Sequence, residues 1–145
     1  APLDLDTFLS NPAEVRIGAF NATRGEEVWF TKEDMRTVEE VGRCVRASST
    51  LPIIMPTVTI DGDTYVDGAL GPDGGIPLDA PMRDGYRKFF VVLTRPREFV
   101  KSPIKPGVYS ALRLAFPHLP SIAEAVARCP RGVSTCVGAV QVRRK

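Results

Sequence analysis

The chain has 145 residues, of which 43% are hydrophobic and 25% are charged. That length fits one domain and is enough to bury a hydrophobic core. Lysine and arginine number 19 against 17 aspartate and glutamate residues, so the net charge of +2 gives no reason to expect nucleic-acid binding. The sequence has neither the run of roughly 20 apolar residues that spans a membrane nor the basic and apolar start of a signal peptide.

In the first third of the chain, the pattern predicts a hairpin and then a helix. Residues 15–20 and 27–30 are β-prone and flank a turn at Arg24-Gly25. A helix is predicted over residues 32–47, because Thr31 can act as an N-cap and apolar residues follow it at helical spacing. Those apolar residues are Met35, Val38, Val41 and Val45.

The middle of the chain predicts a second hairpin and a buried strand. Residues 57–60 and 64–66 flank Asp61-Gly62-Asp63, and two β-prone runs around an Asp-Gly turn indicate a hairpin. Residues 71–75 have the composition of a loop. The continuous apolar run at 88–94 is typical of a strand that is buried on both faces in a parallel sheet.

The last third predicts two helices, at residues 108–116 and 122–128, separated by Pro117 and Pro120. Residues 137–142 are apolar, and their pattern does not decide between a helix and a strand. The basic residues Arg95, Arg97, Lys101 and Lys105 form a loop that could contact anionic head groups, although solvated surface is the favoured interpretation. Because helices and strands alternate along the chain, we expect an α/β layered architecture with an exposed sheet edge.

Three cysteines and one histidine are the candidates for a metal site. Cys129, Cys136 and His118 supply three ligands at most, and no two cysteines have the Cys-x-x-Cys spacing of structural zinc sites. We therefore expect no metal. The odd number of cysteines, with Cys44 as the third, favours reduced thiols in a cytoplasmic protein.

The feature that best suits catalysis is Asp67-Gly68-Ala69, which closes the second hairpin. Hydrolysis by a serine needs a base for the hydroxyl proton and donors for the oxyanion. His118, framed by two prolines, is interpreted as a packing or surface residue. An aspartate fixed at a strand end can act as the base, and glycine allows a positive φ and a close approach. The local chemistry alone also fits a structural turn, because Asp-Gly pairs are common in loops.

Short motifs surround Asp67 in a definite order along the chain. They occupy residues 17–26 (IGAFNATRGE), 46–52 (RASSTLP), 58–62 (VTIDG), 65–69 (YVDGA), 77–80 (PLDA) and 91–96 (VVLTRP). Together they resemble the second half of a patatin-like phospholipase domain. The helical tail around Phe116-Pro117 resembles the C-terminal extension of bacterial members of that family.

The resemblance implies part of a three-layer α/β/α hydrolase fold, in which a Ser–Asp dyad hydrolyses acyl esters of lipids without a metal or an organic cofactor. Asp67 matches the dyad aspartate, the general base, and Gly68 and Ala69 complete its motif. Residues 1–106 then correspond to the C-terminal half of the domain and residues 107–145 to the helical extension. The expected partners are lipid or acyl-ester substrates, with no nucleic acid and at most peripheral membrane contact.

The serine half of the dyad has no match in this sequence. The family's nucleophile lies in Gly-x-Ser-x-Gly, whereas Ser48 and Ser49 lack flanking glycines and Ser134 has only Gly132. The chain also begins with alanine. We therefore expect a fragment of an acyl hydrolase that lacks the N-terminal strands and the nucleophile elbow, is inactive alone and self-associates. The alternative is a non-catalytic lipid- or protein-binding module that keeps the fold without the chemistry.

Overall fold

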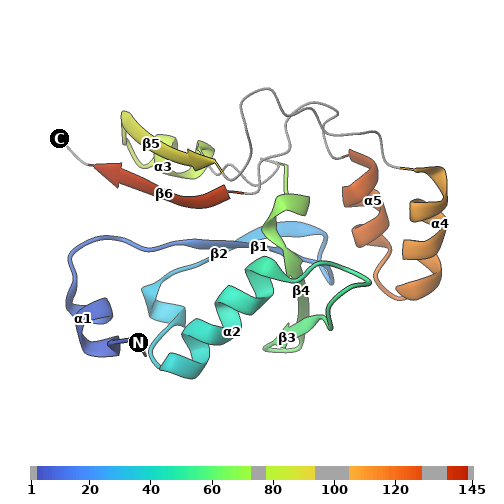
Figure 1. The fold of residues 1–145 in the computed structure, drawn as a ribbon, viewed down its shortest axis with the longest axis horizontal. Helices are drawn as coiled ribbons and strands as arrows, with labels where there is room; N and C mark the ends of the chain where they lie inside the picture. The colour runs from blue at the N-terminus through green and yellow to red at the C-terminus, as the bar shows by residue number, and fades with distance from the viewer. Residues whose placement is uncertain (1–2, 73–77, 94–104, 129–136, 144–145) are drawn as a thin grey trace.

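The structure is a computed structural model that describes residues 3–72, 78–93, 105–128 and 137–143. A four-stranded antiparallel sheet with the strand order β2-β1-β4-β3 lies at its centre (Figure 1). Its strands are β1 (Ile17–Asn21), β2 (Glu26–Phe30), β3 (Val58–Ile60) and β4 (Asp63–Asp67). The helices are α1 (Leu5–Ser10), α2 (Val38–Ser49), α3 (Asp79–Arg83), α4 (Pro106–Ala115) and α5 (Pro120–Arg128), with short 3-10 turns η1 (Lys32–Asp34) and η2 (Gly68–Leu70).

Both predicted hairpins are confirmed. β1 pairs with β2, β3 pairs with β4, and β1 also pairs with β4, so that Ala19 lies between Val28 and Asp67. The tight turn of the second hairpin has φ of 51° at Asp61 and 85° at Gly62. Two successive positive φ angles are what the right-handed twist of a two-residue hairpin requires, and Asp-Gly meets that requirement.

Helices cover both faces of the sheet, which confirms the α/β class. Neighbouring residues of a strand point to opposite faces, and on β1 Ala19 packs beneath α2 whereas Phe20 packs against α4 and α5. Figure 1 shows α2 running across the sheet and α4 beside α5 at one end. The first core contains Phe30, Met35, Cys44, Ala47, Val58 and Tyr65, and the second contains Val66, Leu112, Ile122, Ala123 and Ala125.

The predicted helix over residues 32–47 is wrong at its N-terminus. Thr31 and Asp34 cap only the 3-10 turn η1, after which Met35 and Thr37 adopt non-helical backbone angles. A second capping box, formed by Thr37 and Glu40, starts α2 at Val38. The buried face also differs, because Val38 and Val45 are about half exposed while Cys44 and Ala47 are buried. Two Thr-x-x-acid signals lie six residues apart, and the second one begins the helix.

The prediction of a strand buried on both faces in a parallel sheet is also wrong. β5 (Lys88–Leu93) pairs antiparallel with β6 (Val137–Arg143), in a two-stranded sheet separate from the central one. Phe90 is 67% exposed and Val92 is 43% exposed. An apolar run shows that a strand can be buried, but burial itself depends on which segments pack against it.

The two predicted C-terminal helices are confirmed as α4 and α5, and β6 resolves the open segment at residues 137–142. Of the basic loop, Lys105 is exposed, whereas Arg95, Arg97 and Lys101 lie outside the described residues. Residues 73–75 of the expected loop at 71–75 also lie outside the described residues.

The division of the chain into residues 1–106 and a helical extension at 107–145 stays a prediction. No helix in the described part of the chain is long and apolar enough to cross a membrane.

Candidate active site

Asp67 is the last residue of β4 and is held from three directions. Across the sheet it lies opposite Ala19 of β1. Its backbone N–H donates to the carbonyl of Thr50 at 2.9 Å, which ties it to the end of α2. Its carboxylate oxygen Oδ1 accepts from the N–H of Ala69 at 2.8 Å and so caps η2. The carboxylate therefore occupies a defined position between the sheet, α2 and η2.

Gly68 brings the backbone after Asp67 against β1. A Cβ atom added at Gly68 would lie 2.5 Å from the carbonyl oxygen of Gly18 and 2.9 Å from its carbonyl carbon. The positive φ angles of the described glycines are at Gly25, Gly62 and Gly85. Gly68 is therefore required by the close approach to β1 and not by a left-handed backbone conformation.

The serines and the histidine weighed from the sequence have local contacts of their own. The hydroxyl of Ser49 donates to the carbonyl of Val45 at 2.9 Å, at the end of α2. Ser48 is half-buried in the same helical turn. His118 is exposed in the turn between α4 and α5. Ser134 lies outside the described residues.

A buried polar network centred on Asn21 fixes the start of β4, and the sequence reasoning missed its role. The Asn21 side chain is 1% exposed. Its amide donates to the Asp63 carboxylate at 2.9 Å, and its oxygen accepts from the N–H groups of Thr23 and Arg24, both at 3.0 Å. Arg24 also pairs with Asp63 at 2.8 Å. An asparagine before a turn is the available sequence signal, because its side chain readily bonds the backbone two residues on.

Replacing Asn21 with alanine is expected to lower the free energy of unfolding by about 2 kcal/mol, because the partly buried groups that bond its amide lose their partner. Asn11→Ala is the matched control. The Asn11 oxygen also accepts from a backbone N–H two residues on, at Ala13, but it does so at the surface. This control is expected to change stability by less than about 0.5 kcal/mol. Urea denaturation measures both, and equal effects would contradict a structural role for the buried network.

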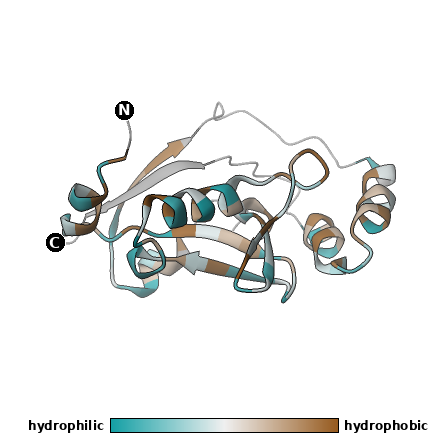
Figure 2. Cartoon of the chain, turned by 90° about the horizontal axis from the view of Figure 1, so that it is seen from below, coloured by the Kyte–Doolittle hydropathy of each residue, from teal (hydrophilic) through white to brown (hydrophobic). Residues whose placement is uncertain are grey.

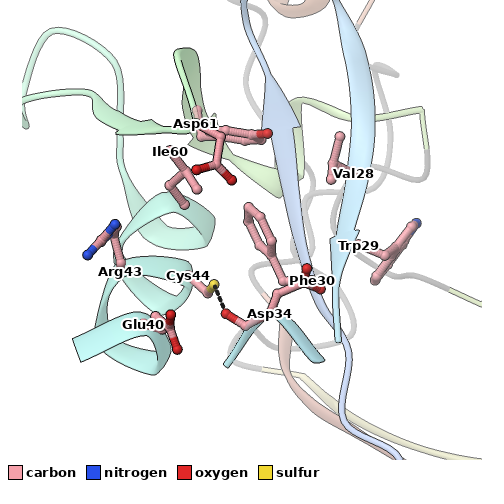
Figure 3. A pocket seen from close by; sticks show the side chains of 10 residues that line it. Val28, Trp29, Phe30, Asp34, Glu40, Arg43, Cys44, Ile60 and Asp61 are labelled. Atoms are coloured by element: carbon pink, nitrogen blue, oxygen red, sulfur yellow. Dashed lines mark hydrogen bonds between the residues drawn. The ribbon is translucent and has the colours of Figure 1, made fainter. Parts of the chain in front are cut away.

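A pocket of ≈ 340 Å³ opens between β2 and α2. Figure 3 shows Phe30 and Cys44 facing it, with Trp29 on the opposite side of β2 from Phe30. Two of its carboxylates already cap backbone groups, since Asp34 accepts from Thr31 at 2.7 Å and Glu40 from Thr37 at 2.9 Å. Its lining includes Tyr65, two residues before Asp67 on β4, but not Asp67 itself.

The buried thiol of Cys44, which lines this pocket, makes the free energy of unfolding depend on pH. Burial raises the pKa of Cys44 above its ordinary 9.0, and the carboxylates of Asp34 and Glu40 add to the effect. Burial likewise raises the pKa of Tyr65 above 10.0. In each case the fold favours the neutral form. The resulting stability is fully present below the ordinary pKa and is lost as the pH rises through the folded-state value.

We therefore expect the free energy of unfolding to fall as the pH rises above about 9. Cys44→Ala should flatten this decline, because one of the two groups no longer titrates. Urea denaturation at several pH values measures the slope for both proteins. A decline of the same steepness in Cys44→Ala and in the unsubstituted chain would contradict the assignment to Cys44.

Within the described ranges, no group of three or more histidine, cysteine, aspartate or glutamate side chains is placed to hold a metal ion. Cys44 is a free, buried thiol. Cys129 and Cys136, the other cysteines considered as ligands, lie outside the described residues.

The part of the chain that carries Asp67 is similar in sequence to one protein family. A family model described as patatin-like phospholipase matches residues 2–81, which is more than half of the chain. The matched range runs from α1 through the four-stranded sheet to α3 and includes Asp67, Gly68 and Ala69. No curated protein and no solved structure matches the chain at a significant level. The chain belongs to the patatin-like phospholipase family.

Proposed function

We propose that this chain supplies the aspartate half of the Ser–Asp dyad of a patatin-like lipid acyl hydrolase, with Asp67 as the general base. Family membership supports the reaction class and lipid esters as substrates. The observation that carries the choice of residue is the placement of Asp67 at the end of β4, with Thr50 and Ala69 bonded to its backbone and side chain. A base must be fixed in position before its pKa matters.

In this reaction Asp67 takes the proton of a serine hydroxyl while the serine oxygen attacks the ester carbonyl. Backbone donors hold the negative charge that forms on the carbonyl oxygen. The proton then passes from Asp67 to the departing alcohol, which leaves an acyl-serine. Water attacks the acyl-serine and Asp67 accepts the water proton. Asp67 then returns this proton to the serine oxygen as the bond between serine and the acyl group breaks, which releases the fatty acid and the free serine. The carboxylate ends each cycle in its starting state.

The serine and the oxyanion loop are proposed to come from sequence outside these 145 residues, which contain no Gly-x-Ser-x-Gly. The chain alone is then expected not to hydrolyse p-nitrophenyl esters. Reading the genomic sequence upstream of the Ala1 codon tests this directly. A Gly-x-Ser-x-Gly motif in the same frame supports the proposal, and a start codon at or just before Ala1 contradicts it.

The second candidate is a non-catalytic lipid- or protein-binding module. The observation that favours it is the cap that Asp67 forms on η2, since this structural contact can by itself account for the aspartate. A chain that starts near Ala1, is stable alone and has no esterase activity would support the module. The two candidates therefore differ in a property that a single sequencing experiment decides.

We also propose that the protein is cytoplasmic.

The 145-residue chain is further proposed to self-associate in solution. Among the described strands, β2 and β3 lie at the edges of the central sheet. Strand edges present unpaired N–H and C=O groups that bind another strand readily. Light scattering at high concentration measures the mass, and a monomer under those conditions would contradict self-association.

A further inference from the structure

The loop between α2 and β3 exposes an unusual concentration of apolar side chains. Four large hydrophobic residues are exposed within five positions: Leu51 at 47%, Ile53 at 54%, Ile54 at 78% and Met55 at 39%. Figure 2 shows strongly hydrophobic colouring in this loop beyond the end of α2. Residues 47–60 include no charged side chain. Scattered apolar residues are normal on a protein surface, but a contiguous group marks an interaction site.

The loop backbone holds these side chains in a defined shape at a local energetic disadvantage. The N–H of Met55 donates to the carbonyl of Leu51 at 3.0 Å and closes a tight turn. Inside that turn Ile53 has φ of 74°. A β-branched residue is disfavoured in this left-handed region, where glycine or asparagine is unstrained. Neither burial nor backbone geometry therefore favours isoleucine at this position.

The loop begins at the end of the sheet that carries Asp67. Thr50, the residue before the loop, accepts the Asp67 backbone N–H at 2.9 Å. The last turn of α2 presents the exposed residues Val45 and Arg46. An apolar tip with an arginine behind it suits the boundary between the acyl chains and the head groups of a lipid layer. The loop therefore combines a membrane-compatible surface with proximity to the proposed base.

We propose that residues 51–56 form an interfacial loop that inserts into the surface of a phospholipid bilayer and places the Asp67 end of the sheet against it. The inference rests on the proposed function, because lipid substrates are what make a bilayer the occupant of this surface. Insertion transfers Ile53, Ile54 and their neighbours from water to the acyl region, which is the driving force for binding.

Flotation of the 145-residue chain with phosphatidylcholine vesicles tests the proposal. Ile54→Ser is expected to reduce vesicle partitioning by about tenfold or more, because it removes the most exposed apolar side chain of the loop. Leu114→Ser is the matched control, since Leu114 is 84% exposed on α4 and lies outside the loop. Unchanged binding in Ile54→Ser, an equal loss in both variants, or no binding by the unsubstituted chain would overturn the proposal.

Depth of insertion gives a second, independent measurement. Ile54→Trp and Leu114→Trp each add a tryptophan to the single native one, Trp29, whose signal is measured in the unsubstituted chain. Brominated phosphatidylcholine is expected to quench the tryptophan at 54 and not the one at 114. Equal quenching at both positions, or none at 54, would overturn the proposal. So would an Ile54→Ser chain that loses self-association but keeps its vesicle binding, because a second copy would then be the occupant.

Neither measurement requires hydrolysis. An Asp67→Asn chain is expected to bind vesicles as the unsubstituted chain does. Failure of the catalytic proposal would appear as retained esterase activity when Asp67→Asn is made in the protein that carries both this chain and the nucleophile motif. Failure of the interfacial loop appears only in flotation and quenching.

Discussion

Gly68→Ala is expected to lower the free energy of unfolding by about 3 kcal/mol, because the new methyl group meets backbone on the neighbouring strand. The ideal Cβ position is 2.5 Å from the Gly18 carbonyl oxygen. A backbone carbonyl inside a sheet cannot rotate away as a flexible side chain can, so β1 and η2 must separate. Because η2 begins at Gly68, the displacement also moves the cap that orients the Asp67 carboxylate.

Gly42→Ala is the matched control for this substitution. Gly42 lies within α2, and a Cβ atom added there meets nothing within 4 Å. Alanine in an exposed helix interior is expected to raise stability by about 0.5–1 kcal/mol. Urea denaturation of the two variants should therefore give shifts of opposite sign. A Gly68→Ala chain as stable as the unsubstituted one would show that the close approach to Gly18 is not required by the fold.

Asp67→Asn is expected to reduce ester hydrolysis by about 10²–10⁴-fold in a protein that carries both this chain and the nucleophile motif. Asparagine keeps an oxygen that can accept the Ala69 N–H, so the cap on η2 survives while the base is lost. Asp67→Ala removes the base and the cap on η2, and it is therefore also expected to lower the free energy of unfolding by about 1 kcal/mol.

Comparison of these two variants separates catalysis from structure. If Asp67 serves only as the cap of η2, Asp67→Asn retains its activity, and Asp67→Ala loses activity only as far as it loses stability. If Asp67 is the base, both variants lose activity alike although their stabilities differ. Initial rates with a p-nitrophenyl ester, measured beside urea denaturation, provide the two quantities.

Local signals in the sequence predicted the parts of the fold that local chemistry decides. Asp61-Gly62 predicts a tight hairpin because the required φ angles are a property of those two residues. Pro117 lies between α4 and α5, and Pro120 is the first residue of α5, for a similarly local reason. The helix start was ambiguous, because Thr31 and Thr37 each have an acidic residue three positions on, and only packing selects between them. The short helix α1 was missed, although Asp4 caps it by accepting from Thr7.

Features that depend on distant segments were not predictable in the same way. The exposure of Phe90 goes with the pairing of β5 with β6, which lies 44 residues or more further along the chain in a sheet of its own. In the candidate site, the motif identified Asp67 and Gly68, but the contact between Gly68 and Gly18 joins residues from different hairpins. The hydrogen bond from Asn21 to Asp63 likewise exists only once β1 and β4 are adjacent. Sequence therefore locates the site, and tertiary structure explains how it is held.

The most direct test of Asp67 as the base of a Ser–Asp dyad is the rate at which a fluorophosphonate probe acylates serine. The protein that carries both this chain and the nucleophile motif is compared with its Asp67→Asn variant. We predict rapid labelling of the serine in Gly-x-Ser-x-Gly and labelling slowed by at least about 10²-fold in the variant. Equal labelling rates in the two proteins, or labelling at Ser48 or Ser49 instead, would contradict the account.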